Sequence, residues 1–154
     1  MSTPDTELYP LLLQQAAALI QDEPDLIAKM ANLSALIYHS LPELNWAGFY
    51  IMRDGELVLG PFQGKVACVR IPVGKGVCGT AVATGETQRI ADVHAFPGHI
   101  ACDAASESEL VIPVRDRAGI VAVLDIDSPV LNRFSAMDQQ MLEQLVSLLE
   151  HSLV

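Results

Sequence analysis

The chain has 154 residues, 51% of them hydrophobic, and a formal net charge of −10 at pH 7. Its length predicts a single domain over residues 1–154, and its apolar content is sufficient for a hydrophobic core. The acidic balance argues against nucleic acid and anionic membranes as partners, because both are bound by basic surfaces. The sequence has no apolar run of the roughly 18 residues that a membrane span needs, and its polar start is unlike a secretory signal. We therefore expect a cytoplasmic protein.

Two helices are expected first. Residues 8–20 are rich in Leu, Gln and Ala at helical spacing. The apolar face of this helix is expected to consist of Leu8, Leu12, Ala16 and Leu19. Pro24 suits the first turn of a second helix, because proline is favoured there, and helical spacing then continues to His39.

Three strands are expected next. Residues 45–52 are aromatic and β-branched, a hairpin turn signal follows at residues 53–56, and residues 57–62 supply the partner strand. A further short strand is expected over residues 65–73.

The second half of the chain predicts helices and strands in turn. A glycine-rich loop leads into a short helix that ends near Gly85. Residues 107–116 and 118–127 predict two more strands joined by a turn. Ser135, with Asp138 three residues later, resembles a capping box and opens a C-terminal helix. Helices segregated to one side of an antiparallel sheet fit this order, so the expected fold class is α+β.

Three cysteines are the strongest chemical signal. A chain in a reducing compartment needs no odd set of thiols for a disulfide framework, so packing, metal binding and redox chemistry are the alternatives. Cys102 lies in a loop rich in Gly, Pro, His and acidic residues, where a reactive thiol is typical, although composition alone equally allows simple packing. Cys68 lies in an apolar, strand-like segment, which favours packing. Cys78 lies at an expected helix N-terminus, a position that lowers a thiol pKa.

Acidic residues occur at the ends of two expected strands. Asp125 and Asp127 are two residues apart, so on a strand both point to one face. Val121 and Val123 precede them on that face, which therefore changes from apolar to acidic. A buried carboxylate needs a partner, whereas a solvated strand end does not, and the sequence leaves both alternatives open. Glu109, which opens the preceding strand, is more simply a solvated end residue.

Aromatic and histidine residues supply two further candidate groups. Trp46 and Tyr50 are four apart on the expected strand, so they share a face, either as core or as the wall of a pocket. His94 and His99 lie near Cys102, but their spacing matches no compact zinc signature, so no metal is expected. We also find no phosphate-loop or nucleophile-elbow motif, and no cofactor is expected.

Four segments resemble a known family. The order of elements resembles a GAF domain, a six-stranded antiparallel sheet flanked by helices. Within that superfamily, the segments that resemble the free methionine-(R)-sulfoxide reductases are NWAGFY, LGPFQGKVACVRIPVGKGVCGTA, PGHIACDAASESELVIPV and VLDIDSP. The cysteines are 10 and then 24 residues apart, as in that family. The chain lacks the NKFDE-type motif of GAF domains that bind cyclic nucleotides.

The resemblance implies a mechanism and a role in oxidative stress. Cys102 would attack the sulfur of free methionine sulfoxide and become a sulfenic acid. Cys68 would resolve it as an intramolecular disulfide that thioredoxin reduces, and Cys78 would be an auxiliary thiol. A homodimer is also expected. The residues implied to bind the substrate are Trp46, Tyr50, Glu109, Asp125 and Asp127.

This chemistry agrees with the residue types. A sulfoxide oxygen leaves poorly until it is protonated, so acids are needed near the thiol, and an acidic pocket attracts the ammonium of a free amino acid. The same acids raise the pKa of a neighbouring thiol, which opposes its attack. The alternative is a GAF-type sensor without turnover, although the chain is too short to carry an output domain as well.

Overall fold

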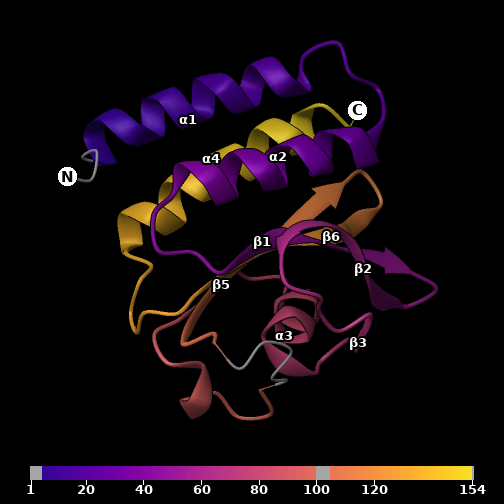
Figure 1. Cartoon of the computed structure of the whole chain (residues 1–154). Helices are drawn as coiled ribbons and strands as arrows, with labels where there is room; N and C mark the ends of the chain where they lie inside the picture. Colours follow the sequence, from indigo (N-terminus) through magenta and orange to yellow (C-terminus); the bar gives the residue numbers. More distant parts are fainter. Residues whose placement is uncertain (1–4, 100–104, 154) are drawn as a thin grey trace.

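The computed structural model describes residues 5–99 and 105–153. In these residues a six-stranded antiparallel sheet is covered on one face by three helices, and α3 (Gly76–Thr84) lies on the other face (Figure 1). The three helices are α1 (Asp5–Ile20), α2 (Leu26–Ser40) and α4 (Ala136–His151). The expected α+β class is confirmed, except that α3 departs from the one-sided arrangement of helices.

The sheet has the strand order β3-β2-β1-β6-β5-β4. The strands are β1 (Trp46–Arg53), β2 (Glu56–Gly64), β3 (Arg70–Pro72), β4 (Gln88–Ile90), β5 (Ser108–Asp116) and β6 (Gly119–Ser128). β1 and β6 lie side by side at the centre although they are far apart in the chain. This pairing joins the aromatic segment to the acidic segment.

Three short elements differ from the sequence prediction. The strand expected over residues 65–73 is only β3, because residues 65–69 form a loop. β4 and the 3-10 helix η1 (Val93–Ala95) were not predicted. Each has three residues, which is too few to show an apolar period.

Helix ends follow local capping chemistry. Asp25 caps α2 by accepting a hydrogen bond from the Ala28 backbone N–H at 2.9 Å, so Pro24 precedes the helix instead of entering its first turn. The capping box of Ser135 and Asp138 at the start of α4 is confirmed. Gly85 ends α3 with a left-handed φ of 71°, as expected.

The sheet separates two apolar cores. The core on the helix side includes β-strand side chains that alternate along the central strands: Ala47, Phe49, Ile51, Leu110, Ile112, Val114, Ala122, Leu124 and Ile126. The core on the α3 side contains Trp46, Tyr50, Leu57, Ile71, Val77, Cys78, Ala81, Val111 and Val123. The alternation of strand side chains therefore decides which residues can reach α3.

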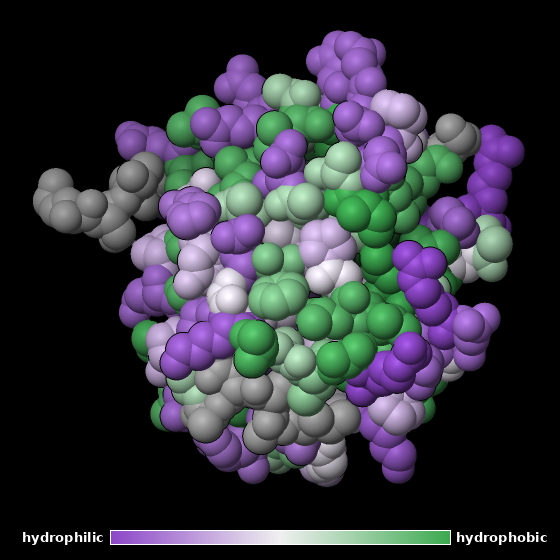
Figure 2. Space-filling model, turned by 45° about the vertical axis from the view of Figure 1, so that its right-hand side comes forward, coloured by the Kyte–Doolittle hydropathy of each residue, from purple (hydrophilic) through white to green (hydrophobic). Residues whose placement is uncertain are grey.

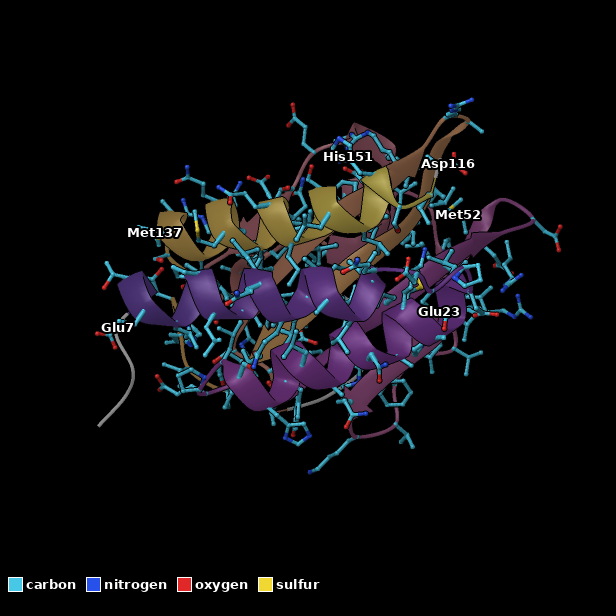
Figure 3. All side chains as sticks on the ribbon, turned by 90° about the horizontal axis from the view of Figure 1, so that it is seen from above. Glu7, Glu23, Met52, Asp116, Met137 and His151 are labelled. Carbon is cyan, nitrogen blue, oxygen red and sulfur yellow. The ribbon has the colours of Figure 1, made fainter. Side chains whose placement is uncertain are left out.

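Helix α1 lies over α2 and α4, which themselves pack on the sheet (Figures 1 and 3). Its buried residues are Tyr9, Leu12, Ala16 and Ile20. The prediction was correct for Leu12 and Ala16, whereas Tyr9 and Ile20 are buried in place of the predicted Leu8 and Leu19. The Tyr9 hydroxyl donates to Asp138 Oδ1 at 2.6 Å, which ties α1 to α4. Among residues 5–99 and 105–153, no helix has the length and apolar character that crossing a membrane requires.

Candidate active site

A pocket opens on the α3 side of the sheet and has a volume of about 520 Å³, including its open mouth. Most of this volume is open to solvent, and the space that the centre of a water-sized molecule can occupy inside the pocket is about 40 Å³. Six residues singled out in the sequence line it: Trp46, Tyr50, Cys78, Glu109, Asp125 and Asp127. The structure therefore brings together the aromatic, acidic and one of the thiol candidates.

Strand register explains how the acidic and aromatic residues meet. Trp46 is paired with Asp127, and Asp127 is also paired with Glu109 on its other side. Because side chains alternate, Tyr50 and Asp125 point to the same face as these residues. Asp125 is 6% exposed and Glu109 is 7% exposed, so the prediction of a solvated end residue is wrong for Glu109.

The acidic residues at the end of β6 are also more buried than the sequence suggests. Val123 precedes Asp125 on the pocket face, as expected, whereas Val121 packs toward the helices. Asp127 is half-buried. These carboxylates belong to the pocket because α3 covers the strand end.

Trp46 and Tyr50 form the apolar wall of the pocket, and Phe62 stacks on Trp46 behind them. The ring centroids of Trp46 and Tyr50 are 5.9 Å apart with an interplanar angle of 24°, and those of Trp46 and Phe62 are 5.1 Å apart at 14°. Gly48 makes room for the stack, since a Cβ there would lie 2.3 Å from the Phe62 Cβ. This wall suits a small apolar group such as an S-methyl.

The two site aromatics also hold the loop that carries Cys68. Trp46 Nε1 donates to the Lys65 carbonyl at 3.1 Å, and the Tyr50 hydroxyl donates to the Cys68 carbonyl at 2.9 Å. The Leu59 backbone N–H donates to the Val69 carbonyl at 2.8 Å. Residues 65–69 are therefore fixed to β1 and β2 at three backbone points.

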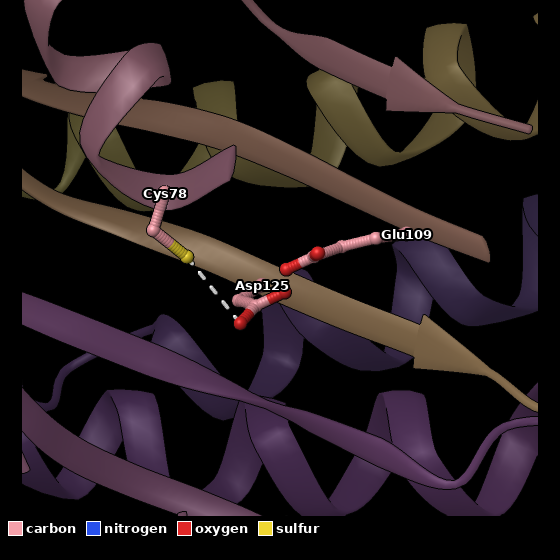
Figure 4. A group of neighbouring side chains, drawn as sticks. All are labelled: Cys78, Glu109 and Asp125. Atoms are coloured by element: carbon pink, nitrogen blue, oxygen red, sulfur yellow. Dashed lines mark hydrogen bonds between the residues drawn. The ribbon is translucent and has the colours of Figure 1, made fainter. Parts of the chain in front are cut away.

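The polar end of the pocket contains a thiol and two buried carboxyls (Figure 4). Cys78 Sγ donates to Asp125 Oδ2 at 3.4 Å, and Glu109 points toward Asp125 from the neighbouring strand. The second oxygen, Asp125 Oδ1, is buried and has no hydrogen-bond partner among the described residues. A buried acceptor of this kind is costly unless a donor reaches it, so it marks a place for a ligand's donor group.

Burial is the main influence on the pKa values of the two carboxyls, Glu109 and Asp125. Burial, with the nearby Asp125 charge next in weight, raises the pKa of Glu109 well above its ordinary range. Burial also raises the pKa of Asp125, and hydrogen bonds from Glu109 and Cys78 oppose that rise. Of the two carboxyls, Glu109 is therefore the better proton donor, because no hydrogen bond opposes the rise of its pKa.

Cys78 is the N3 residue of α3, as the sequence indicated, but the inferred lowering of its pKa is wrong. Burial, and then the charges of Asp125 and Glu109, raise the pKa of the Cys78 thiol well above its ordinary range. The helix N-terminus is outweighed because the side chain points into the acidic pocket. Cys78 is a free, buried and neutral thiol.

The other two cysteines have different outcomes. Cys68 lies in the loop before β3, is half-buried, and takes part in a disulfide bond. It is therefore not a packed strand residue, which corrects the simple packing prediction. Cys102 lies outside the described residues.

Five further lining residues were not considered in the sequence, and a sixth, His99, was considered only as a metal ligand: Ala67, Ile71, Gly76, Val77 and Ser106 are the five. Most of them neighbour predicted site residues in the chain, which is the signal that could have found them. His99 is separate: burial and the nearby His94 lower its pKa, which keeps the imidazole neutral at neutral pH. The rings of His94 and His99 have centroids 6.3 Å apart.

Two groups have donor atoms close enough for a metal ion. Donor atoms of Cys78, Glu109 and Asp125 lie within 4.8 Å of one another, as do those of Asp92, His94 and Glu107. In the second group, contacts of one side chain account for the geometry, because His94 Nδ1 lies 3.3 Å from Asp92 and 3.5 Å from Glu107. In the first group, the hydrogen bond from Cys78 to Asp125 and the places of Asp125 and Glu109 on neighbouring strands account for it.

Comparisons with known proteins show which proteins the chain resembles. The GAF domain model matches residues 29–153. The chain is 63% identical over 147 residues to protein YtsP of Bacillus subtilis (strain 168), covering 94% of this chain and 90% of that protein. It is 59% identical over 145 residues to the free methionine-R-sulfoxide reductase of Escherichia coli (strain K12), covering 94% and 88%. The structure of fRMsr of Staphylococcus aureus in complex with substrate has a TM-score of 0.93 and 51% identity, covering 100% of this chain and 99% of that one.

Proposed function

Because the chain belongs to the GAF domain family, and within it to the free methionine-R-sulfoxide reductases, we propose that it reduces free L-methionine (R)-S-oxide to L-methionine. The observation that carries the proposal is the two-ended pocket. An aromatic wall of Trp46 and Tyr50 faces a buried acidic end with an unpaired oxygen on Asp125. A free amino acid with an S-methyl group has chemistry for both ends.

In the proposed reaction, the Cys102 thiolate attacks the sulfoxide sulfur. The S–O oxygen is protonated and transferred to Cys102, so methionine leaves and Cys102 becomes a sulfenic acid. The Cys68 thiol then attacks this sulfur, and the products are water and a Cys68–Cys102 disulfide. The disulfide bond of Cys68 in the structure supports this pairing.

The three acidic residues of the pocket have different roles in the proposed reaction. Protonated Glu109 supplies the proton that makes the sulfoxide oxygen a better leaving group. Asp125 accepts a hydrogen bond from the substrate ammonium at its buried oxygen, and Asp127, half-buried at the pocket rim, adds negative charge. Cys78 stays protonated and orients Asp125 through its hydrogen bond.

The proposed function also includes reduction of the disulfide after each turnover and assembly of the chain into a dimer. Thioredoxin reduces the Cys68–Cys102 disulfide in the cytoplasm, where the enzyme counters oxidative stress by repairing free methionine. The enzyme works as a homodimer, which light scattering in solution would test.

The function is tested by measuring methionine release from free methionine sulfoxide and from N-acetyl-methionine sulfoxide. Acetylation removes the ammonium charge but keeps the sulfoxide, so activity on the acetylated compound should be poor. Comparable rates on both compounds would contradict the proposed role of the acidic end. Binding of free methionine sulfoxide without any methionine release would instead favour the GAF-type sensor.

A further inference from the structure

Two valines on the loop of Cys68 point into solvent. The side chain of Val66 is 86% exposed and that of Val69 is 59% exposed, whereas Ala67 between them lines the pocket. The loop therefore has an inner face toward the substrate and an outer apolar face that brackets Cys68. Figure 2 shows hydrophobic side chains gathered on the side of the molecule that carries β2 and β3.

The exposure of these valines is not caused by a loose loop. The carbonyls of Lys65, Cys68 and Val69 are each held by a hydrogen bond from β1 or β2. With the backbone fixed on the pocket side, the two valines are presented outward in a set position. A preorganised apolar face of this kind loses little conformational entropy when a partner covers it.

The chemistry of Cys68 indicates which partner covers the face. A reductant thiolate attacks one sulfur of the disulfide, and attack at Sγ of Cys68, whose neighbours Val66 and Val69 are exposed, forms a mixed disulfide and releases the other cysteine as a thiolate. A second thiol of the reductant then attacks the mixed disulfide, releases Cys68, and leaves the reductant as a disulfide, so two electrons and two protons pass to the enzyme. Each step needs the reductant's thiols within bonding distance of Cys68, and hence its surface against the neighbouring residues.

We propose that Val66 and Val69 form the docking surface for the dithiol protein that reduces the Cys68 disulfide. This inference rests on the proposed function, in which thioredoxin is that reductant. The contact is apolar, Cys68 lies between the two valines in the chain, and the tethered loop fixes the course of the backbone. It contributes to recycling only, because both side chains point away from the substrate pocket.

The test is the double variant Val66→Gln/Val69→Gln, assayed with free methionine sulfoxide and either thioredoxin or dithiothreitol as reductant. The KM for thioredoxin should rise about tenfold, because the variant removes two apolar contacts at the centre of the interface. Turnover supported by dithiothreitol should stay unchanged, because this small dithiol needs no docking surface. The matched control is Leu11→Gln, which alters an apolar side chain of 53% exposure on α1, beyond the other face of the sheet.

The outcomes separate this inference from the proposed function. An unchanged KM for thioredoxin, or an equal loss with both reductants, would overturn the docking surface while leaving the reductase intact. A change in oligomeric state by light scattering, with no change in KM, would assign the two valines to a second copy of the chain and also overturn it. Absence of methionine release by the unaltered protein would refute the proposed function itself.

Discussion

The buried carboxylate of Asp125 offers the most direct test of the site. Replacing Asp125 by Asn keeps the shape of the side chain and an acceptor oxygen for the Cys78 thiol, which lies 3.4 Å away. It removes the negative charge at the oxygen that has no partner among the described residues. We expect kcat/KM for free methionine sulfoxide to fall by about ten- to a hundredfold while the chain stays folded.

The magnitude follows from the environment of the carboxylate. Asp125 is 6% exposed, so water screens its interaction with a substrate ammonium only weakly. A hydrogen bond to a charged group contributes about 1.5–3 kcal/mol. Since about 1.4 kcal/mol corresponds to a factor of ten in rate, this contribution corresponds to the expected loss.

The assay combines steady-state turnover with thermal unfolding of the same variant. Asp116→Asn is the matched control, because Asp116 is an exposed carboxylate at the β5–β6 turn whose bond from the Ala118 N–H an amide oxygen can replace. Both variants should unfold near the temperature of the unaltered protein, and only Asp125→Asn should lose activity. Near-normal turnover by a folded Asp125→Asn protein would refute the role of this charge in substrate binding.

Three further predictions concern recycling, pH and the helix layer. Cys68→Ser should still release methionine in one turnover but fail to recycle with thioredoxin; normal recycling, measured by NADPH consumption, would move the resolving role to Cys78. The pKa of Glu109 is raised in the folded protein above its ordinary value of 4.5, so the protonated side chain stabilises the fold fully below pH 4.5. This contribution to the stability is lost as the pH rises through the folded pKa. Glu109→Gln should therefore flatten the fall in melting temperature above pH 4.5, and identical profiles for the two proteins would contradict the burial argument. Tyr9→Phe should lower the free energy of unfolding by about 1–3 kcal/mol in denaturant melts, because Asp138 loses a buried hydrogen-bond donor. The activity should be unchanged, and an activity loss as large as that of Asp125→Asn would show coupling through the sheet.

Strand periodicity accounts for the part of the site that could be predicted. Residues spaced by two or four along a strand share a face, which correctly placed Trp46 with Tyr50 and Asp125 with Asp127. Their meeting across strands depends on the β1–β6 pairing, a contact between distant segments that no local pattern encodes. The resemblance to a known family supplied that long-range information.

Other features depend on tertiary contacts that override local signals. The apolar segment around Cys68 has the composition of a strand, yet Trp46 and Tyr50 bind its backbone carbonyls and hold it as a loop. The depth of Glu109 and the raised pKa of Cys78 both follow from how α3 covers the end of the sheet. Burial of this kind cannot be derived from a single strand or helix.

The hydrogen bonds from Trp46 and Tyr50 to the Cys68 loop have a thermodynamic consequence. The same two rings are the apolar wall of the pocket, so ligand occupancy and the redox state of Cys68 act on shared atoms. By linkage, if oxidation changes the affinity for methionine by some factor, methionine must change the oxidation equilibrium by the same factor. Each tenfold difference in methionine affinity between the dithiol and disulfide forms should shift the midpoint potential by about 30 mV. Titrating the potential with and without saturating methionine would measure this coupling, and identical potentials would show that the dithiol and disulfide forms bind methionine equally, so that the shared rings transmit no coupling.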